Sequence, residues 1–232
     1  MTPACASAGP SLTALNLPGP LPMEAGGTLD GGDKWVEVLW RRSAPEVVVF
    51  ANLLSDAECD ALMEQAAPRL STSLTVDVTT GSELLHAART SEGMFFERGE
   101  SDVVQRVENR IAKLLHWPTQ NGEGLQILRY TQGGQYQPHY DYFDPAEAGT
   151  PKLLMRGGQR VATLIMYLQS PEAGGATVFP DLNLQVLPVR GRAVFFSYAE
   201  PAATSLTLHG GAPVLAGQKW IATKWLRQHT FA

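Results

Sequence analysis

A short motif in the C-terminal half of the chain carries two side chains that can bind a metal ion. His139 and Asp141 lie two residues apart, and His209 follows far downstream. Two imidazoles and one carboxylate make up the facial triad that holds non-haem Fe(II) and leaves positions open for reactants, although Zn, Ni and Co accept the same donors. Residues two apart in a strand share a face, so His139 and Asp141 can reach one ion while Tyr140 points away. The spacing therefore predicts a metal centre whose third ligand comes from another strand.

A lysine beyond the second histidine extends this candidate site. Lys219 follows His209 by ten residues and shares strand parity with Ile221, Thr223 and Trp225. If that face points inward, the ammonium group lies among apolar walls, where it needs an anionic partner. A dicarboxylate cosubstrate would supply that partner. The alternative is an exposed charge at the end of a strand.

The other three histidines do not suggest further ligands. His116 ends an apparent amphipathic helix, His229 lies near the C-terminus, and His86 lies in a weakly patterned segment rich in Ser and Thr. We expect all three to be structural or solvated. Because an isolated His-x-Asp pair is a short motif with many chance matches, its interpretation depends on the elements around it.

The elements that must position these residues fall into two halves. In the first half, short β-rich runs precede a helix that opens with a Ser55–Glu58 capping box and continues to about Ala66. Apolar residues at helical spacing predict a second helix from about Asp102, stopped by Pro118. In the second half, β-rich runs lie between Gly and Pro residues, at 125–130, 161–168, 193–198 and 220–226. We predict an α+β fold with a double-stranded β-helix (jelly-roll) core and supporting N-terminal helices.

The chain divides into a short tail and one domain. Residues 1–33 are rich in Pro and Gly and read as a flexible tail, although their leucines could pack on the domain or on a partner. Residues 34–232 show no internal repeat and no linker. We predict that they form a single domain.

The composition excludes several classes of partner. The net charge is −5, so no basic field attracts nucleic acid or an anionic membrane. The N-terminus lacks the basic and apolar regions of a secretory signal, and no apolar run is long enough to cross a bilayer. Two cysteines, Cys5 and Cys59, do not suggest a structural disulfide. We expect a cytoplasmic protein with no nucleic-acid or membrane partner.

Several motifs in order resemble one enzyme family, the 2-oxoglutarate- and Fe(II)-dependent prolyl 4-hydroxylases of bacterial and algal type. The motifs are LQILRYTQGGQYQPHYDYF (125–143), GQRVATLIMYL (158–168), GGATVFP (174–180), HGGAPV (209–214) and KWIATKW (219–225). The resemblance extends over about residues 45–227. One departure is Ala176, where the family often has a glutamate, and it bears on substrate choice rather than on cofactor use.

The resemblance implies three groups of site residues. The iron ligands are His139, Asp141 and His209. The side chains that bind the distal carboxylate of 2-oxoglutarate are Lys219, Tyr130 and Thr177. The side chains that line the peptide groove are Tyr136, Arg160 and Trp225. The family fold is a double-stranded β-helix, in agreement with the fold expected from the strand pattern.

The implied reaction is hydroxylation of peptidyl proline at C4. It consumes 2-oxoglutarate and O2, releases succinate and CO2, and can use ascorbate as a reductant. The implied partner is a proline-containing peptide or protein. A related hydroxylase of a free amino acid or small metabolite is the enzymatic alternative. The non-enzymatic alternative is a barrel that binds a metal or a ligand without turnover. The complete set of three metal ligands, together with Lys219, argues against it. The carboxylate of Asp141 also argues against a halogenase, which needs that position free for halide.

Overall fold

Two antiparallel β-sheets face each other in a computed structural model of the protein, which describes residues 17–21, 27–72, 75–76, 83–84 and 90–232. The larger sheet runs in the order β1 (Thr28–Asp30), β2 (Trp35–Ser43), β3 (Glu46–Ala51), β14 (Ala193–Ser197), β10 (Arg160–Gln169), β17 (Lys219–Arg227), β8 (Leu125–Tyr130), β7 (Glu92–Phe96) and β4 (Ser71–Thr72). The smaller sheet runs in the order β13 (Leu184–Val186), β12 (Thr177–Phe179), β15 (His209–Gly211) and β9 (Tyr136–His139). Two further strand pairs are β11 (Ala173–Gly174) with β16 (Val214–Ala216), and β5 (Thr75–Val76) with β6 (Glu83–Leu84). The predicted jelly-roll core and α+β class are confirmed.

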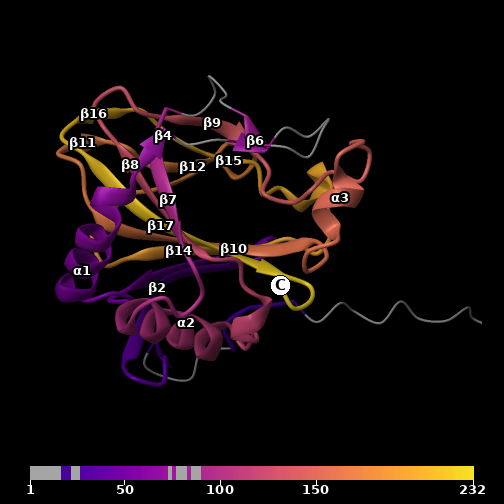
Figure 1. Cartoon of the computed structure of the whole chain (residues 1–232), viewed down its shortest axis with the longest axis horizontal. Helices are drawn as coiled ribbons and strands as arrows, with labels where there is room; N and C mark the ends of the chain where they lie inside the picture. Colours follow the sequence, from indigo (N-terminus) through magenta and orange to yellow (C-terminus); the bar gives the residue numbers. More distant parts are fainter. Residues whose placement is uncertain (1–16, 22–26, 73–74, 77–82, 85–89) are drawn as a thin grey trace, which may run out of the picture.

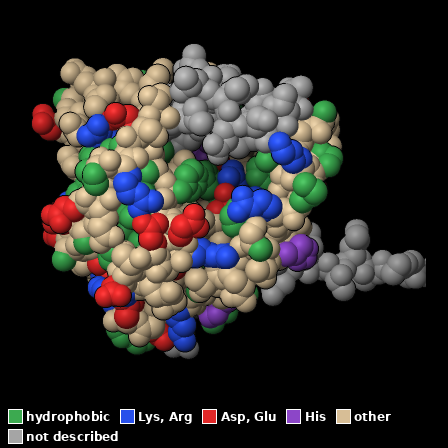
Figure 2. All heavy atoms as spheres, viewed as in Figure 1, with side chains coloured by type: hydrophobic (Ala, Val, Ile, Leu, Met, Phe, Trp, Pro, Cys, Tyr) green, Lys and Arg blue, Asp and Glu red, His purple; other side chains and the backbone are tan. Residues whose placement is uncertain are grey.

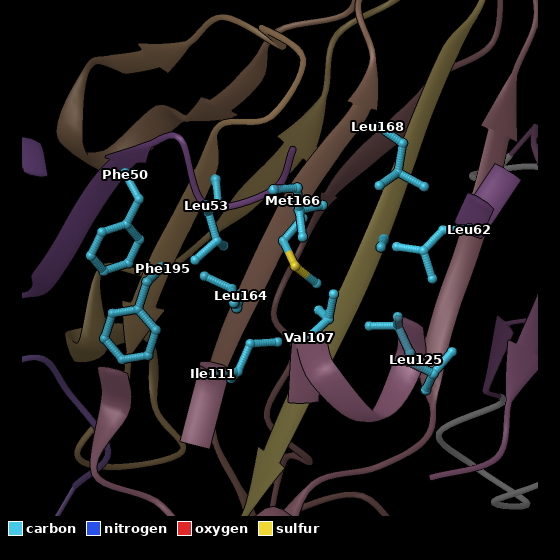
Figure 3. Packing of buried hydrophobic residues seen from close by; sticks show 14 of the residues in the cluster. Phe50, Leu53, Leu62, Val107, Ile111, Leu125, Leu164, Met166, Leu168 and Phe195 are labelled. Carbon is cyan, nitrogen blue, oxygen red and sulfur yellow. The ribbon is translucent and has the colours of Figure 1, made fainter. Parts of the chain in front are cut away.

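The central strands of the larger sheet are buried on both faces, which explains their nearly continuous apolar runs. On β10, Leu164 and Met166 face the helices, whereas Ile165 and Tyr167 face the smaller sheet. Figure 3 shows the helix-side cluster, in which Val107 lies among side chains of the sheet. Figure 1 shows the helix α2 on one side of β10, β14 and β17, and β9, β12 and β15 on the other. The two apolar layers therefore share one central sheet.

Two helices cover the outer face of that sheet, as predicted. Helix α1 (Asp56–Ala66) begins after Ser55, whose hydroxyl accepts from the Glu58 backbone while the Glu58 carboxylate accepts from the Ser55 backbone. This confirms the capping box. Helix α2 (Asp102–Leu115) ends at His116, which has a left-handed backbone with φ of 50°. The remaining helical segments are α3 (Thr150–Leu154) and the 3-10 turns η1 (Ala67–Arg69), η2 (Thr119–Asn121), η3 (Pro180–Leu182) and η4 (Ala203–Ser205).

The strand predictions hold closely in the second half, where β8 spans the predicted residues. Strands β10 and β17 are one residue longer than predicted at each end, and β14 is one residue shorter at its C-terminal end. One local prediction needs correction. Strand β9 ends at His139, and Asp141 lies in the bend that follows, so the two ligands are not in one continuous strand. No helix in the described residues is long and apolar enough to span a membrane.

Part of the expected flexible tail packs on the domain. Strand β1 pairs with β2, so the boundary predicted at residue 34 falls between two paired strands. The Gly19 amide donates to the Leu115 carbonyl at 2.9 Å, and the Arg41 guanidinium donates to the carbonyls of Pro20 and Leu21. Residues 17–21 and 27–33, which lie on the tail side of the predicted boundary, therefore contact the domain in this structure. Residues 1–16 and 22–26 lie outside the described part of the chain.

Candidate active site

A cavity opens between the inner face of the larger sheet and the smaller sheet. It encloses about 430 Å³ of space, its open mouth included. Figure 2 shows the corresponding side of the molecule hollowed near its centre, where hydrophobic, basic and acidic side chains meet. The lining residues are Gln126, Leu128, Tyr130, Tyr136, His139, Asp141, Ile165, Thr177, His209, Gly210, Gly211, Lys219, Ile221, Thr223 and Trp225.

The three predicted metal ligands meet at one wall of this cavity. Strands β9 and β15 are antiparallel neighbours, and His139 lies opposite His209 in their register. The Nε2 atom of His139 is 3.5 Å from Oδ1 of Asp141, and the Nε2 atom of His209 is 3.4 Å from Oδ2. One ligand atom from each residue lies within 4.8 Å of the others. The predicted convergence of the three side chains is therefore confirmed.

Backbone carbonyls orient both imidazoles. Nδ1 of His139 is 2.9 Å from the Gln137 carbonyl, and Nδ1 of His209 is 3.0 Å from the Thr207 carbonyl. A carbonyl can only accept, so this contact assigns the ring hydrogen to Nδ1 and leaves the lone pair of Nε2 directed toward Asp141. Metal-bound histidines commonly use this outer hydrogen bond. Both rings are thus held in the tautomer that binds a divalent cation.

The charge states also fit a metal site. Burial disfavours the imidazolium form and lowers the pKa of His209 to about 4. Burial alone would raise the pKa of Asp141, but His209, His139 and Arg160 outweigh it and hold that pKa well below its usual range. At neutral pH the site therefore presents a neutral His209 and an ionised carboxylate, which are the forms that coordinate metals.

Close packing of the smaller sheet keeps the ligands together. A Cβ atom on Gly210 would lie 2.8 Å from the Tyr136 carbonyl oxygen, so a side chain there would push β15 away from β9. The Tyr136 ring stacks on the His139 ring with centroids 3.7 Å apart. The Phe196 ring lies 4.6 Å from that of His209. These contacts restrict how far either imidazole can move.

Lys219 lies on the wall formed by β17, with 3% of its surface exposed. Of the two positions considered for this side chain, inward or exposed at the end of a strand, the structure shows the inward one. It pairs in register with Tyr130 on β8, and its Nζ is 5.5 Å from the centroid of the Tyr130 ring. Burial lowers its pKa to about 8, and no acidic residue in the described part of the chain forms an ion pair with it. A buried cation without a counter-ion is costly unless a ligand supplies the negative charge.

The hydroxyl groups of Tyr167 and Thr177 form a hydrogen bond beside the same cavity. The Tyr167 hydroxyl on β10 donates to Oγ1 of Thr177 on β12 at 2.8 Å. Because Thr177 accepts this hydrogen bond, its own hydroxyl hydrogen is free to point into the cavity that it lines. Tyr130 also lines the cavity and is 4% exposed. The three residues predicted to bind a distal carboxylate therefore all border one space.

Trp225 and Arg160 form a stacked pair at the opposite end of β17. The Arg160 guanidinium carbon is 3.9 Å from the Trp225 ring centroid, and its nitrogens donate to the Glu123 carboxylate at 2.7 and 2.9 Å. Arg160 does not line the cavity, whereas the sequence interpretation placed it on the groove wall. The Glu123 carboxylate also accepts from Arg227, so one carboxylate serves two guanidinium groups, while Arg160 supports the indole ring by stacking on it. The buried Nε1 of Trp225 has no hydrogen-bond partner among the described residues.

Several cavity residues were not identified from the sequence. Ile221 and Thr223 were noted for sharing the parity of Lys219, and the same rule applied to β8 would have added Gln126 and Leu128. Ile165 carried no such signal, since every residue of that apolar run on β10 is a plausible core residue. The exposed His116 and His229 lie away from the site, as expected, and His86 is outside the described residues.

Comparison with known proteins identifies close relatives of this arrangement. Residues 125–227 match the family model described as the 2OG-Fe(II) oxygenase superfamily. Prolyl 4-hydroxylase 5 of Arabidopsis thaliana is 40% identical over 222 residues, which cover 86% of this chain and 74% of the relative. Prolyl 4-hydroxylase 1 of the same plant is 41% identical over 202 residues, covering 80% and 70%. A solved 2-oxoglutarate complex of the viral collagen prolyl hydroxylase of Paramecium bursaria Chlorella virus 1 is 32% identical, with a TM-score of 0.61 and coverage of 78% and 95%.

Proposed function

Because this chain belongs to the prolyl 4-hydroxylase family of the 2OG-Fe(II) oxygenases, we propose that it hydroxylates proline within a peptide or protein. Its chemistry is that of a dioxygenase dependent on Fe(II) and 2-oxoglutarate. The observation that carries the proposal is one cavity bordered both by the His-Asp-His cluster and by a buried lysine with no acidic partner among the described residues.

The donor set of the cavity fits Fe(II). His139 and His209 offer imidazole nitrogens and Asp141 a carboxylate oxygen, which would hold the ion on one side and leave the other side open. When bound there, Fe(II) supplies the chemistry that couples oxidative decarboxylation of 2-oxoglutarate by O2, giving succinate and CO2, to insertion of one oxygen atom into a C–H bond. The protein positions the reactants and keeps water out. Leu128, Ile165 and Ile221 give the cavity the apolar walls for this exclusion.

Lys219 is the proposed anchor for the distal carboxylate of 2-oxoglutarate. An ammonium group donates a charge-assisted hydrogen bond to a carboxylate, and the bond is stronger in an apolar cavity than in water. Thr177 and Tyr130 add hydroxyl donors on the same border of the cavity. Binding of the cosubstrate would supply the negative charge that Lys219 lacks in the free protein.

The proposed peptide groove lies over Tyr136 and Trp225. Aromatic rings favour extended proline-rich segments, whose polyproline II conformation is formed before binding. Arg160 and Glu123 hold the indole ring in place by stacking and by their ion pair. A free amino acid has no continuing chain to occupy such a groove.

The proposal is tested by loading the purified protein anaerobically with Fe(II) and 2-oxoglutarate and then adding O2 with a proline-rich peptide. We expect mass spectrometry to show one added oxygen atom on proline at C4, with one succinate released for each oxygen gained. Free proline in a parallel reaction should gain no oxygen. Hydroxylation of free proline alone would contradict the peptide assignment and support the small-metabolite alternative.

A matched pair of histidine variants separates the metal site from general effects on folding. His139→Ala should abolish both hydroxylation and succinate release, because it removes a metal ligand. His229→Ala removes an exposed histidine outside the cavity and should keep both activities. Full activity in His139→Ala would contradict the ligand assignment.

A further inference from the structure

The second carboxylate oxygen of Asp141 is bound by a buried hydroxyl. Oγ1 of Thr163 donates to Oδ2 of Asp141 at 2.7 Å, and Thr163 has no exposed surface. The hydroxyl oxygen of Tyr198 lies 3.1 Å from the same Oγ1, and Tyr198 is 2% exposed. The carboxylate is therefore the end of a three-residue chain of hydrogen bonds that continues away from the cavity.

The direction of each hydrogen bond in this chain follows from proton counting. A threonine hydroxyl has one hydrogen, and an ionised carboxylate can only accept, so the Thr163 hydrogen is committed to Asp141. Thr163 must then accept from Tyr198, whose phenol donates. Hydrogen bonds in such a chain polarise one another, so Tyr198 strengthens the donation from Thr163 to Oδ2.

Both hydroxyls are held on rigid backbone. Thr163 lies within β10, between β14 and β17, opposite Phe196 and Trp225 in the two registers. Tyr198 follows β14 directly, and its amide donates to the Val161 carbonyl at 3.0 Å. The donor to Oδ2 therefore comes from the centre of the larger sheet, whereas Asp141 itself lies in a bend after β9. A fixed sheet residue orients a ligand whose own backbone is less regular.

This arrangement distinguishes the two oxygens of the ligand. Oδ1 lies 3.5 Å from Nε2 of His139 and Oδ2 lies 3.4 Å from Nε2 of His209, so each oxygen faces a metal-binding nitrogen. Of the two, only Oδ2 also accepts a hydroxyl hydrogen bond among the described residues, from Thr163, which takes up one of its lone pairs. A carboxylate can bind a metal through one oxygen or through both. Binding through both would take one more coordination position, which a cosubstrate or O2 needs.

We propose that Thr163 and Tyr198 are positioning residues that restrict Asp141 to metal binding through Oδ1 alone. The proposal rests on the metal site of the proposed function. Loss of the Thr163 hydroxyl frees Oδ2 to compete for the position that 2-oxoglutarate must enter. Metal affinity is then kept or increased, while 2-oxoglutarate affinity for the metal-loaded protein falls.

Thr163→Val and Thr163→Ser form the matched pair that tests the proposal, since valine keeps the shape and serine keeps the hydroxyl. Co(II) serves as the probe metal, and calorimetry measures Co(II) binding first and 2-oxoglutarate binding to the Co(II)-loaded protein second. We expect Thr163→Val to weaken 2-oxoglutarate binding about tenfold with Co(II) affinity unchanged or tighter, and Thr163→Ser to restore the natural values. The visible absorption of Co(II), which reports coordination number, should differ between Thr163→Val and the natural protein.

Tyr198→Phe provides a second variant that leaves Thr163 in place. It should weaken 2-oxoglutarate binding in the same direction but less, about threefold, because Thr163 can still donate to Oδ2. Equal weakening of Co(II) and 2-oxoglutarate binding in Thr163→Val, or a Thr163→Ser protein that behaves like Thr163→Val, would overturn the proposal. Failure of the natural protein to bind Co(II) at all would instead contradict the metal site itself.

Discussion

Two buried lysines on the same strand show how differently one protein can treat the same charge. Lys224 and Lys219 both lie on β17, but their parity differs, so Lys224 faces the helices and Lys219 faces the cavity. Nζ of Lys224 donates to Oε1 of Glu108 at 2.5 Å, with 2% and 0% of the two side chains exposed. Lys219 has no such partner in the described part of the chain.

The presence or absence of an acidic partner distinguishes Lys224, whose charge is neutralised within the fold, from Lys219, whose charge is available to a ligand. Burial lowers the pKa of both lysines, and at Lys224 the Glu108 carboxylate opposes that effect. The counter-ion of Lys224 is part of the fold, so this pair is complete without a ligand. No acidic side chain of the described residues pairs with Lys219, and in the proposed function its counter-ion is the bound cosubstrate. A buried charge therefore points to a ligand only when the fold leaves it unpaired.

The largest expected effect comes from breaking the complete pair. Lys224→Met should lower the free energy of unfolding by ~3–5 kcal/mol, because Glu108 stays buried without its cation. Urea denaturation measures this change. The double variant Lys224→Met/Glu108→Leu removes both charges and should recover most of the loss. If the double variant is as unstable as the single one, lost packing rather than the unpaired carboxylate explains the effect.

The corresponding change at Lys219 should affect binding rather than folding. Lys219→Met should weaken 2-oxoglutarate binding to the Co(II)-loaded protein about a hundredfold, because the distal carboxylate loses its charged donor. In the absence of cosubstrate the free energy of unfolding should rise by ~1 kcal/mol, because a buried unpaired cation is removed. Calorimetry and urea denaturation measure the two quantities. If Lys219→Met is destabilised as much as Lys224→Met and its affinity for 2-oxoglutarate is unchanged, the two lysines do not differ in role as proposed.

The pKa of Lys219 predicts how cosubstrate affinity depends on pH. In the free protein this pKa is about 8, and a bound carboxylate raises it, so binding favours the protonated amine. Affinity should be constant below about pH 8 and fall up to about tenfold per pH unit above it. The side chain facing Lys219 across the sheet is Tyr130, and the chain has no carboxylate paired with it in the described residues. Lys219→Arg keeps its charge and should lose this dependence, whereas an unchanged slope in that variant would assign it to another group.

The same lysine predicts the opposite trend for the stability of the cosubstrate-free protein. Its pKa is about 8 in the fold and near its ordinary value of 10.5 when unfolded, so the unfolded chain binds more protons between these values. Lys219 should therefore make the protein more stable as pH rises from 8 to 10.5. The difference in urea midpoint between the natural protein and Lys219→Met, followed across this range, isolates its contribution. A difference that does not shrink with rising pH would contradict the assignment.

The smallest effect concerns the hydroxyls near Lys219. Tyr167→Phe removes the donor to Thr177 and should weaken 2-oxoglutarate binding about threefold, because the Thr177 hydroxyl loses its orientation but not its hydrogen. Thr177→Val removes that hydrogen and should have the larger effect. Calorimetry on the Co(II)-loaded variants measures both. If Tyr167→Phe weakens 2-oxoglutarate binding as much as Lys219→Met does, the hydroxyl groups contribute more than the ammonium group to binding of the distal carboxylate.

The sequence alone allowed the helices, the main strands and the ligand set to be predicted. The apolar residues of α2 repeat at helical spacing, and the Ser55–Glu58 capping box marks the start of α1, so both helices were identified from neighbours in the chain. Strand parity placed Lys219 on the same face of its strand as Ile221, Thr223 and Trp225, and the structure shows that this face lines the cavity. His139, Asp141 and His209 were recognised because their motifs occur in a characteristic order. All of these signals are local or depend only on order along the chain.

Contacts between distant segments decided the rest. The partner of Lys224 is Glu108, 116 residues away, and nothing near either residue indicates the pairing. Thr163 reaches Asp141 from a continuous apolar strand, Arg160 pairs with Glu123, and β1 adds to the sheet from a segment rich in glycine. Whether a buried polar group is satisfied depends on which strands lie side by side, and local periodicity does not contain that information. For this reason only the tertiary structure showed that Lys224 is paired within the fold and that Lys219 has no acidic partner among the described residues.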